Sequence, residues 1–116
     1  MKTLTAGQTL ESSARLFKAF SDPVRLRLLN LLSDREVCVC HLHAALALPQ
    51  PTVSRHLASL RKAGIVVGRK EGLWVHYRLA KASSELHRRL LSCVGSIVEL
   101  ETSRNDRERL ASLTCC

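Results

Sequence analysis

Two cysteines near the middle of the chain are the residues best suited to chemistry. Cys38 and Cys40 lie in the run EVCVCHLHAAL, at the start of a short segment with a helical pattern. A thiolate is both a soft ligand and a nucleophile, and a helix N-terminus lowers the pKa of a cysteine. Free cysteine is also a common buried residue. The pair alone therefore supports three interpretations: a site for a thiophilic ion, a redox pair, or core packing.

The spacing of the two cysteines predicts how an ion would act on them. Side chains two residues apart point about 200° apart in a regular helix, but they share one side of an extended backbone. We therefore expect Cys38 to be an N-cap with extended dihedral angles and Cys40 to lie in the first helical turn. Binding one ion with both sulfurs would then require this first turn to loosen.

The remaining cysteines and histidines give weaker signals. Cys93 falls on an apolar helical stripe and is predicted to pack in the core, whereas Cys115 and Cys116 end the chain as a neighbouring pair. His76 and His87 are predicted to be surface groups. No nucleophile with a base, phosphate-binding loop or carboxylate pair is recognisable, so we expect the protein not to be an enzyme.

The elements around the thiols are predicted from two periodicities. Apolar residues at helical spacing predict four helices, at about 9–20, 24–32, 39–46 and 51–63. Gly64 ends the fourth helix, and the period then changes to two, which predicts a β-hairpin of 65–69 and 73–79 with a basic tip. A last long helix is predicted from Ser83 or Ser84 to about Glu101, followed by a charged segment that is either a short helix or a frayed end.

This order predicts a mainly α protein with a β-hairpin wing, a winged helix-turn-helix. The helix 51–63 would enter the major groove, and the wing would lie over the neighbouring DNA backbone. Arg55 is placed to read a guanine and Gln50 an adenine. Further DNA contacts are predicted at Thr52, Ser54, Ser59, Lys62, Arg69, Lys70 and Arg78. We expect a DNA-binding and dimerisation domain at 1–102 and a C-terminal tail at 103–116.

Composition favours a nucleic-acid partner. The 116 residues carry a formal net charge of +8, which suits an acidic partner. The apolar stripes of the first and last helices have no obvious partner in so short a chain. They predict a homodimer that reads an inverted repeat in a double-stranded DNA operator. No apolar run approaches a membrane span and no signal peptide is recognisable, so we expect no membrane partner and a cytoplasmic location.

Three runs of residues form one larger pattern: SDPVRLRLLNLL, EVCVCHL and QPTVSRHLASLRKAGIVVGRKEGLWVHYRL. Together they resemble the ArsR (ArsR/SmtB) metalloregulatory repressors over roughly 16–79. The resemblance implies a winged-helix homodimer that represses an operon until a metal or metalloid ion releases it from DNA. The CVC run resembles the arsenic-responsive branch, which implies that As(III) or Sb(III) is the inducer of an arsenic-resistance operon. The inducer would be bound by Cys38 and Cys40, and no organic cofactor is implied.

The sequence departs from that branch at the third ligand, because the branch often has a cysteine where His43 stands here. The third ligand is open between Cys115 or Cys116, His43, and a water or buffer molecule. Cadmium- and lead-sensing relatives add cysteines from an N-terminal extension, and residues 1–37 contain none. Zinc-sensing relatives use spaced ligands on the last helix, but Val98 stands where a second histidine is expected. A sensor of Cd, Pb or Zn and a thiol redox switch are the alternatives.

Overall fold

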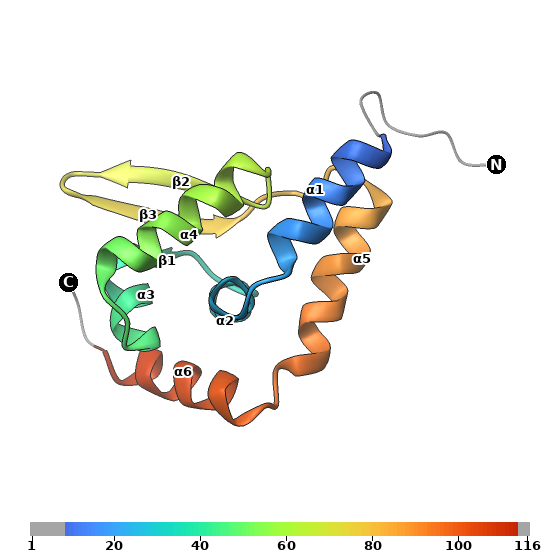
Figure 1. Cartoon of the computed structure of the whole chain (residues 1–116). Helices are drawn as coiled ribbons and strands as arrows, with labels where there is room; N and C mark the ends of the chain where they lie inside the picture. Colours follow the sequence, from blue (N-terminus) through green and yellow to red (C-terminus); the bar gives the residue numbers. More distant parts are fainter. Residues whose placement is uncertain (1–8, 114–116) are drawn as a thin grey trace.

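The computed structural model describes residues 9–113, and the elements follow the predicted order (Figure 1). The helices are α1 (Leu10–Phe20), α2 (Pro23–Leu31), α3 (Val39–Leu46), α4 (Gln50–Lys62), α5 (Glu85–Val94) and α6 (Glu101–Ser112), with a 3₁₀ turn at Gly95–Ile97. The strands are β1 (Val37–Cys38), β2 (Val66–Glu71) and β3 (Trp74–Leu79). The predicted mainly α fold with a β-hairpin wing is confirmed.

Side chains that cap the helices explain where three of them begin. Thr9 and Ser12 form a reciprocal capping box at the start of α1. Asp22 accepts a hydrogen bond from the backbone N–H of Arg25 at 3.1 Å, and Pro23 occupies the first helical position of α2. Ser84, one of the two predicted caps, accepts from the backbone N–H of His87 at 3.1 Å. These contacts satisfy N–H groups that have no partner within the helix.

The wing is part of a three-stranded antiparallel sheet in the order β1-β3-β2. The hairpin closes between Glu71 and Trp74, and Gly72 adopts a φ of +61° in the turn, which favours glycine. Strand β1 pairs Cys38 with His76 of β3. The sequence did not predict β1, because two residues are too few to show a period. The pairing joins the wing to the segment that enters α3.

The core is formed mainly by the apolar sides of α2, α3 and α4. The predicted stripe of α4 is buried completely: Val53, Leu57 and Leu60 are 0% exposed. It meets Leu28 of α2 and Leu42 of α3, which are also 0% exposed. Burial of a leucine of this kind contributes about 1.5–3 kcal/mol, so this packing sets how α4 lies on the other two helices.

The end of the chain differs from the predicted single long helix. α5 ends at Val94, a 3₁₀ turn follows, and the charged segment forms α6, which packs against α2 and α3 (Figure 1). Arg107 stabilises the connection by donating from Nη1 to the Val98 carbonyl at 2.6 Å. The predicted packing of Cys93 is wrong for this chain, because α5 directs His87 and Val94 inward and leaves Cys93 exposed. Within residues 9–113, no helix is long and apolar enough to cross a membrane.

His87 is buried rather than at the surface, which corrects the prediction. Its side chain lies in the first turn of α5 and is 0% exposed. Its Nδ1 accepts a hydrogen bond from the backbone N–H of Ser83 at 3.1 Å, whereas Nε2 has no partner within the described part of the chain. Burial disfavours the charged imidazolium and lowers the pKa of His87.

The buried imidazole predicts a pH dependence of stability. Below an unfolded-state pKa of about 6.5 the unfolded chain takes up a proton at this residue, while the folded protein keeps it neutral. The contribution of His87 is therefore complete above about pH 6.5 and is lost as the pH falls through the lower, folded-state pKa. We expect urea unfolding to show a steeper loss of unfolding free energy between about pH 6.5 and 5 in the wild type than in His87→Gln. Equal slopes would contradict this assignment.

Candidate functional site

One face of α4 presents the side chains predicted to contact DNA. Because its apolar stripe is buried, the opposite face is open to solvent. The structure leaves Gln50, Arg55 and Lys62 exposed and Thr52, Ser54 and Ser59 half-buried. The helix contains no acidic residue. A helix of this charge and shape fits a groove lined by phosphates.

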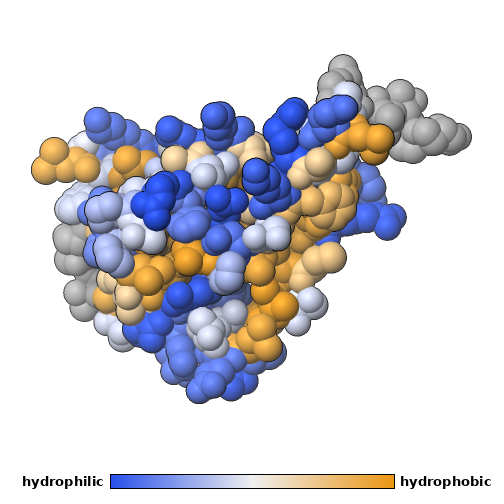
Figure 2. Space-filling model, viewed as in Figure 1, coloured by the Kyte–Doolittle hydropathy of each residue, from blue (hydrophilic) through white to orange (hydrophobic). Residues whose placement is uncertain are grey.

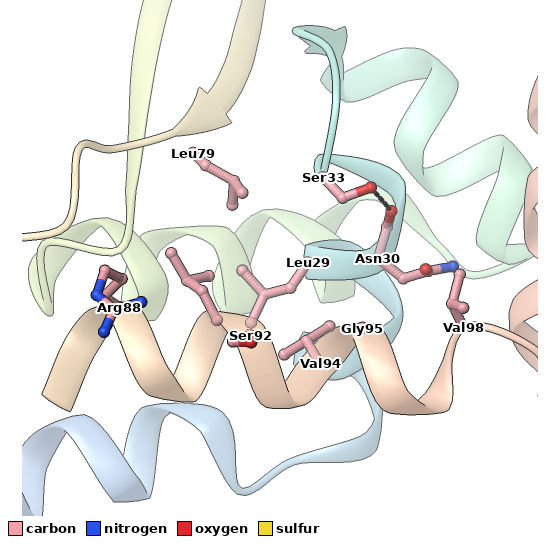
Figure 3. Close-up of a pocket in the computed structure, with 10 residues that line it drawn as sticks. Leu29, Asn30, Ser33, Leu79, Arg88, Ser92, Val94, Gly95 and Val98 are labelled. Carbon is pink, nitrogen blue, oxygen red and sulfur yellow. Dashed lines mark hydrogen bonds between the residues drawn. The ribbon is translucent and has the colours of Figure 1, made fainter. Parts of the chain in front are cut away.

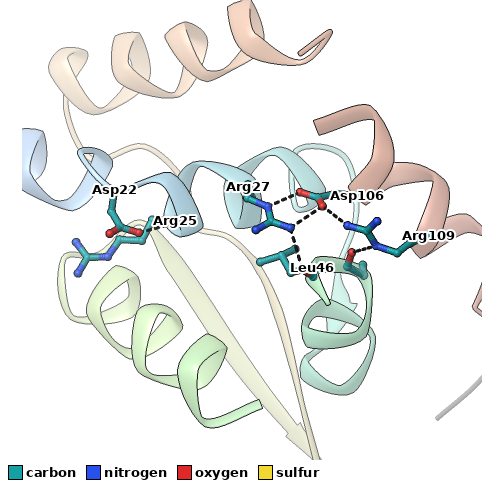
Figure 4. A network of polar contacts seen from close by, with 7 residues as sticks. Asp22, Arg25, Arg27, Leu46, Asp106 and Arg109 are labelled. Atoms are coloured by element: carbon teal, nitrogen blue, oxygen red, sulfur yellow. Dashed lines mark hydrogen bonds and ion pairs between the residues drawn. The ribbon is translucent and has the colours of Figure 1, made fainter. Parts of the chain in front are cut away.

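A polar contact that was not predicted ties α4 to α2. Arg25 donates from Nε to Nδ1 of His56 at 3.2 Å, and the Asp22 carboxylate lies 3.6 Å from the same nitrogen. Figure 4 shows Asp22 and Arg25 at the start of α2. Because an arginine N–H only donates, Nδ1 of His56 carries a lone pair in this arrangement. The helix α4 is thus held on α2 by a directional contact in addition to its apolar stripe.

The wing is joined to the segment before α3 by an ion pair. Arg69 of β2 donates from Nη2 and Nε to the two carboxylate oxygens of Glu36, at 2.7 and 3.2 Å. The hydrogen bond from Arg69 lowers the pKa of the half-buried Glu36 carboxyl. Lys70 and Arg78 are both exposed. Glu36 was missed because it lies 33 residues from Arg69 and no local pattern connects them.

The two thiols meet at the junction of β1 and α3. Cys38 is the N-cap of α3, with φ −68° and ψ 144°, and its Sγ lies 2.9 Å from Sγ of Cys40. The predicted N-cap position is therefore confirmed. The two sulfurs meet although α3 is intact from Val39, because the extended ψ of Cys38 turns both of them to one side. That an ion bound by both sulfurs loosens the first turn of α3 stays a prediction. Cys38 is buried at 4% exposure and Cys40 is half-buried.

A third ligand is not assembled by the residues that the structure describes. Nδ1 of His43 lies 3.2 Å from the Leu48 carbonyl, so this histidine is engaged at the far end of α3. Among residues 9–113, no group of three or more His, Cys, Asp or Glu side chains could hold a metal ion. Cys115 and Cys116 lie outside the described residues. The structure thus provides two sulfur donors, and their role as ligands stays a prediction.

A pocket of about 390 Å³ lies between α2, α5 and the end of β3 (Figure 3). Its lining is mainly apolar, with Leu29 from α2 and Val94 from α5. The Asn30 side chain lines it too, and its buried Nδ2 has no partner among the described residues. The lining contains neither a thiol nor a carboxylate, so the pocket is not a second soft-ion site. The groups suited to DNA and ion chemistry remain those of α3, α4 and the wing.

Comparison with known proteins identifies the family. Residues 22–67 match the family described as bacterial regulatory protein, arsR family. The uncharacterized HTH-type transcriptional regulator MJ1325 of Methanocaldococcus jannaschii is 53% identical over 68 residues, which cover 58% of this chain and 76% of that protein. The chain belongs to the ArsR family.

Two further proteins extend the comparison. The arsenical resistance operon repressor of Escherichia coli is 52% identical over 67 residues, covering 57% of this chain and 57% of that protein, so this chain spans little more than half of it. The homodimeric winged helix-turn-helix DNA-binding domain Mb0332 of Mycobacterium bovis superimposes with a TM-score of 0.65 at 32% identity. It covers 84% of this chain and 94% of its own. The predicted winged helix-turn-helix is confirmed. The protein is therefore one of the transcriptional repressors of the ArsR/SmtB family, which bind DNA and are not enzymes.

The ion pair of the ArsR-family wing predicts a measurable pKa shift. We expect NMR titration of the Glu36 side chain to give a pKa below the ordinary value of 4.5, because Arg69 stabilises the carboxylate. Arg69→Gln should raise the pKa of Glu36 towards that value. Arg89→Gln, a change on α5, is the control and should leave it unchanged. An unaltered pKa in Arg69→Gln would show that the ion pair does not form in solution.

Proposed function

We propose that the protein represses an arsenic-resistance operon and leaves its operator when trivalent arsenic or antimony binds the thiolates of Cys38 and Cys40. The observation that carries the proposal is the 2.9 Å approach of the two Sγ atoms in a DNA-binding chain. Soft thiolates favour thiophilic ions over hard cations. The relative from Escherichia coli, named as an arsenical resistance operon repressor, supports arsenic as the ion.

The position of the thiols couples them to both DNA-contacting elements. Cys38 ends β1, which pairs with β3 of the wing, and Cys40 lies in the first turn of α3, which packs against α4. An ion held by both sulfurs joins these elements at one point and ties down a buried cysteine. We infer that a movement of this junction shifts both the wing and the recognition helix α4. Effector and DNA then weaken each other by the same factor.

A tail cysteine is a suitable third ligand. α6 packs against α3, and both Leu113 and Cys40 pack against the same apolar core. Cys115 and Cys116 follow Leu113 by two and three residues, a reach of about 7–10 Å in extended chain. A water or buffer ligand is the other arrangement that two protein sulfurs allow. The protein acts on its operator in the cytoplasm, where thiols stay reduced.

A homodimer would cover the apolar surface that α1 and α5 leave open. Figure 2 shows hydrophobic side chains gathered along these two helices. On α1, Leu10 is 85% and Phe17 54% exposed, and Leu100 is 59% exposed. Large apolar side chains grouped in this way mark an interaction surface. A two-fold dimer presents two copies of α4, which suits an inverted repeat in double-stranded DNA.

Arsenite titration of reduced protein tests the thiol site. We expect ultraviolet absorbance from sulfur-to-arsenic transitions and release of a DNA duplex that the wild-type protein had selected from a random library. Cys38→Ser should abolish both effects, because one thiolate cannot chelate the ion. Cys93→Ser is the matched control and should behave as the wild type, since this exposed cysteine lies on α5. A full response in Cys38→Ser would exclude the proposed site.

Further measurements distinguish the two possible third ligands and separate an arsenic sensor from a sensor of another ion or a redox switch. A chain ending at Leu113 should lose tight arsenite binding if a tail cysteine is the third ligand and keep it if the ligand is exogenous. Release by Cd²⁺, Pb²⁺ or Zn²⁺ at lower concentration than arsenite would identify another ion sensor. Release by peroxide without any ion, with two thiols oxidised to a disulfide and peroxide reduced to water, would identify a redox switch.

Substitutions on α4 and on the wing are expected to weaken DNA binding in two different ways. Arg55→Ala should cost about 1–3 kcal/mol on the selected duplex and relax specificity at one base pair, because a bidentate arginine discriminates bases. Lys70→Ala should weaken all duplexes alike and reduce the slope of log affinity against log salt by about 1. Fluorescence anisotropy across a salt series measures both. Interchanged behaviour would show that the wing, and not α4, reads the bases.

A further inference from the structure

A buried carboxylate on α6 lies between two arginines. Asp106 is 0% exposed, and its Oδ2 and Oδ1 accept hydrogen bonds from Nε and Nη2 of Arg27 at 2.8 and 2.9 Å (Figure 4). Oδ1 also accepts from Nη2 of Arg109 at 2.8 Å. Paired contacts of this kind are among the strongest that a carboxylate makes, and burial makes them necessary. The buried ion pair between Arg27 and Asp106 thereby attaches α6 to α2.

The same two arginines bind the end of α3. Arg27 donates from Nη2 to the Leu46 carbonyl at 2.8 Å, and Arg109 donates from Nε to the Ala45 carbonyl at 2.6 Å. The last four carbonyls of a helix have no partner within it, and positive charge is favourable there. Asp106 thus holds two cations against the C-terminus of α3, where they would otherwise repel each other.

The turn after α3 directly follows the two carbonyls that the arginines bind. The carbonyls of His43 and Ala44 accept from the backbone N–H groups of Leu48 and Ala47, so the turn and the arginines together occupy the four final carbonyls. Ala47 has a φ of +57°, which costs a residue with a Cβ roughly 1–2 kcal/mol. Such a conformation persists only when its surroundings hold it. Only three residues separate the end of α3 at Leu46 from the start of the recognition helix α4 at Gln50.

We propose that Asp106 is a positioning residue for DNA recognition, acting through Arg27 and Arg109 on the end of α3 and so on the direction of α4. The inference rests on operator binding by α4 and adds a role for α6, which lies outside the 22–67 region that matches the family. Asp106 itself is buried and does not contact DNA. Its effect is on how well α4 discriminates the operator from other sequences.

The test compares two substitutions that change the net charge equally. Asp106→Asn keeps the size of the side chain and removes its charge. Glu85→Gln is the matched control, because Glu85 on α5 also binds two arginines, Arg88 and Arg89, but is exposed and is not bonded to α3. Both variants gain one positive charge, which by itself favours DNA.

The readout is the ratio of the affinity for the selected duplex to the affinity for a scrambled duplex. All variants are measured at the same temperature, chosen so that it lies below the thermal midpoint of every variant. We expect Asp106→Asn to lower this ratio about tenfold, within the usual range of coupling between sites. Glu85→Gln should leave the ratio unchanged.

A second variant covers the case in which Asp106→Asn does not fold. Arg109→Gln removes only the partly exposed arginine, leaves the Asp106–Arg27 pair, and should lower the ratio about threefold relative to Arg89→Gln. An unchanged ratio in Arg109→Gln, or in a folded Asp106→Asn with a lower thermal midpoint, would assign the network to packing alone and overturn the proposal. Failure of arsenite to release wild-type protein would instead refute the proposed inducer without affecting this ratio.

Discussion

The extended backbone of one residue, Cys38, is the constraint on which the rest of the structure depends. With φ −68° and ψ 144°, this residue is both the last residue of β1 and the N-cap of α3. Extended dihedral angles let it pair with His76 of the wing strand, and the same angles turn its sulfur towards that of Cys40. A helical Cys38 would lose both relations at once. The wing, the thiol pair and the start of α3 therefore share a single local conformation.

α3 is consequently the element through which separate functions meet. Its N-terminus carries the thiols, its apolar side packs against α4, and its C-terminus is bound by Arg27 and Arg109. A short helix of this kind has little stability of its own, since isolated helices below about 12–15 residues are marginal in water. Its geometry is set by these neighbours. We therefore propose that a change at either end of α3 alters the position of α4.

The ion pairs of Glu85 and Asp106 contribute differently to stability because one carboxylate is exposed and the other is buried. The Glu85 carboxylate, exposed between Arg88 and Arg89, has its pKa lowered to about 2, yet solvent screens such a pair and its contribution to stability is small. Asp106 makes comparable contacts at 0% exposure, where an unpaired charge is costly. The exposed network belongs to the surface of α5, whereas the buried one governs how α6 lies on α2 and α3.

The sequence by itself determined the local elements: α1 to α4, the hairpin, and an N-cap at Cys38. Each of these depends on neighbours within a few residues, so periodicity, capping residues and glycine positions suffice to predict them. The three motifs also carried the family resemblance. Only the tertiary structure decided the pairing of β1 with β3, the burial of His87, and the bonds from Arg27 and Arg109 to the C-terminus of α3. Arg27 and Asp106 lie 79 residues apart. No local pattern records such a contact, because it forms only when packing brings distant charges together in a place that excludes water.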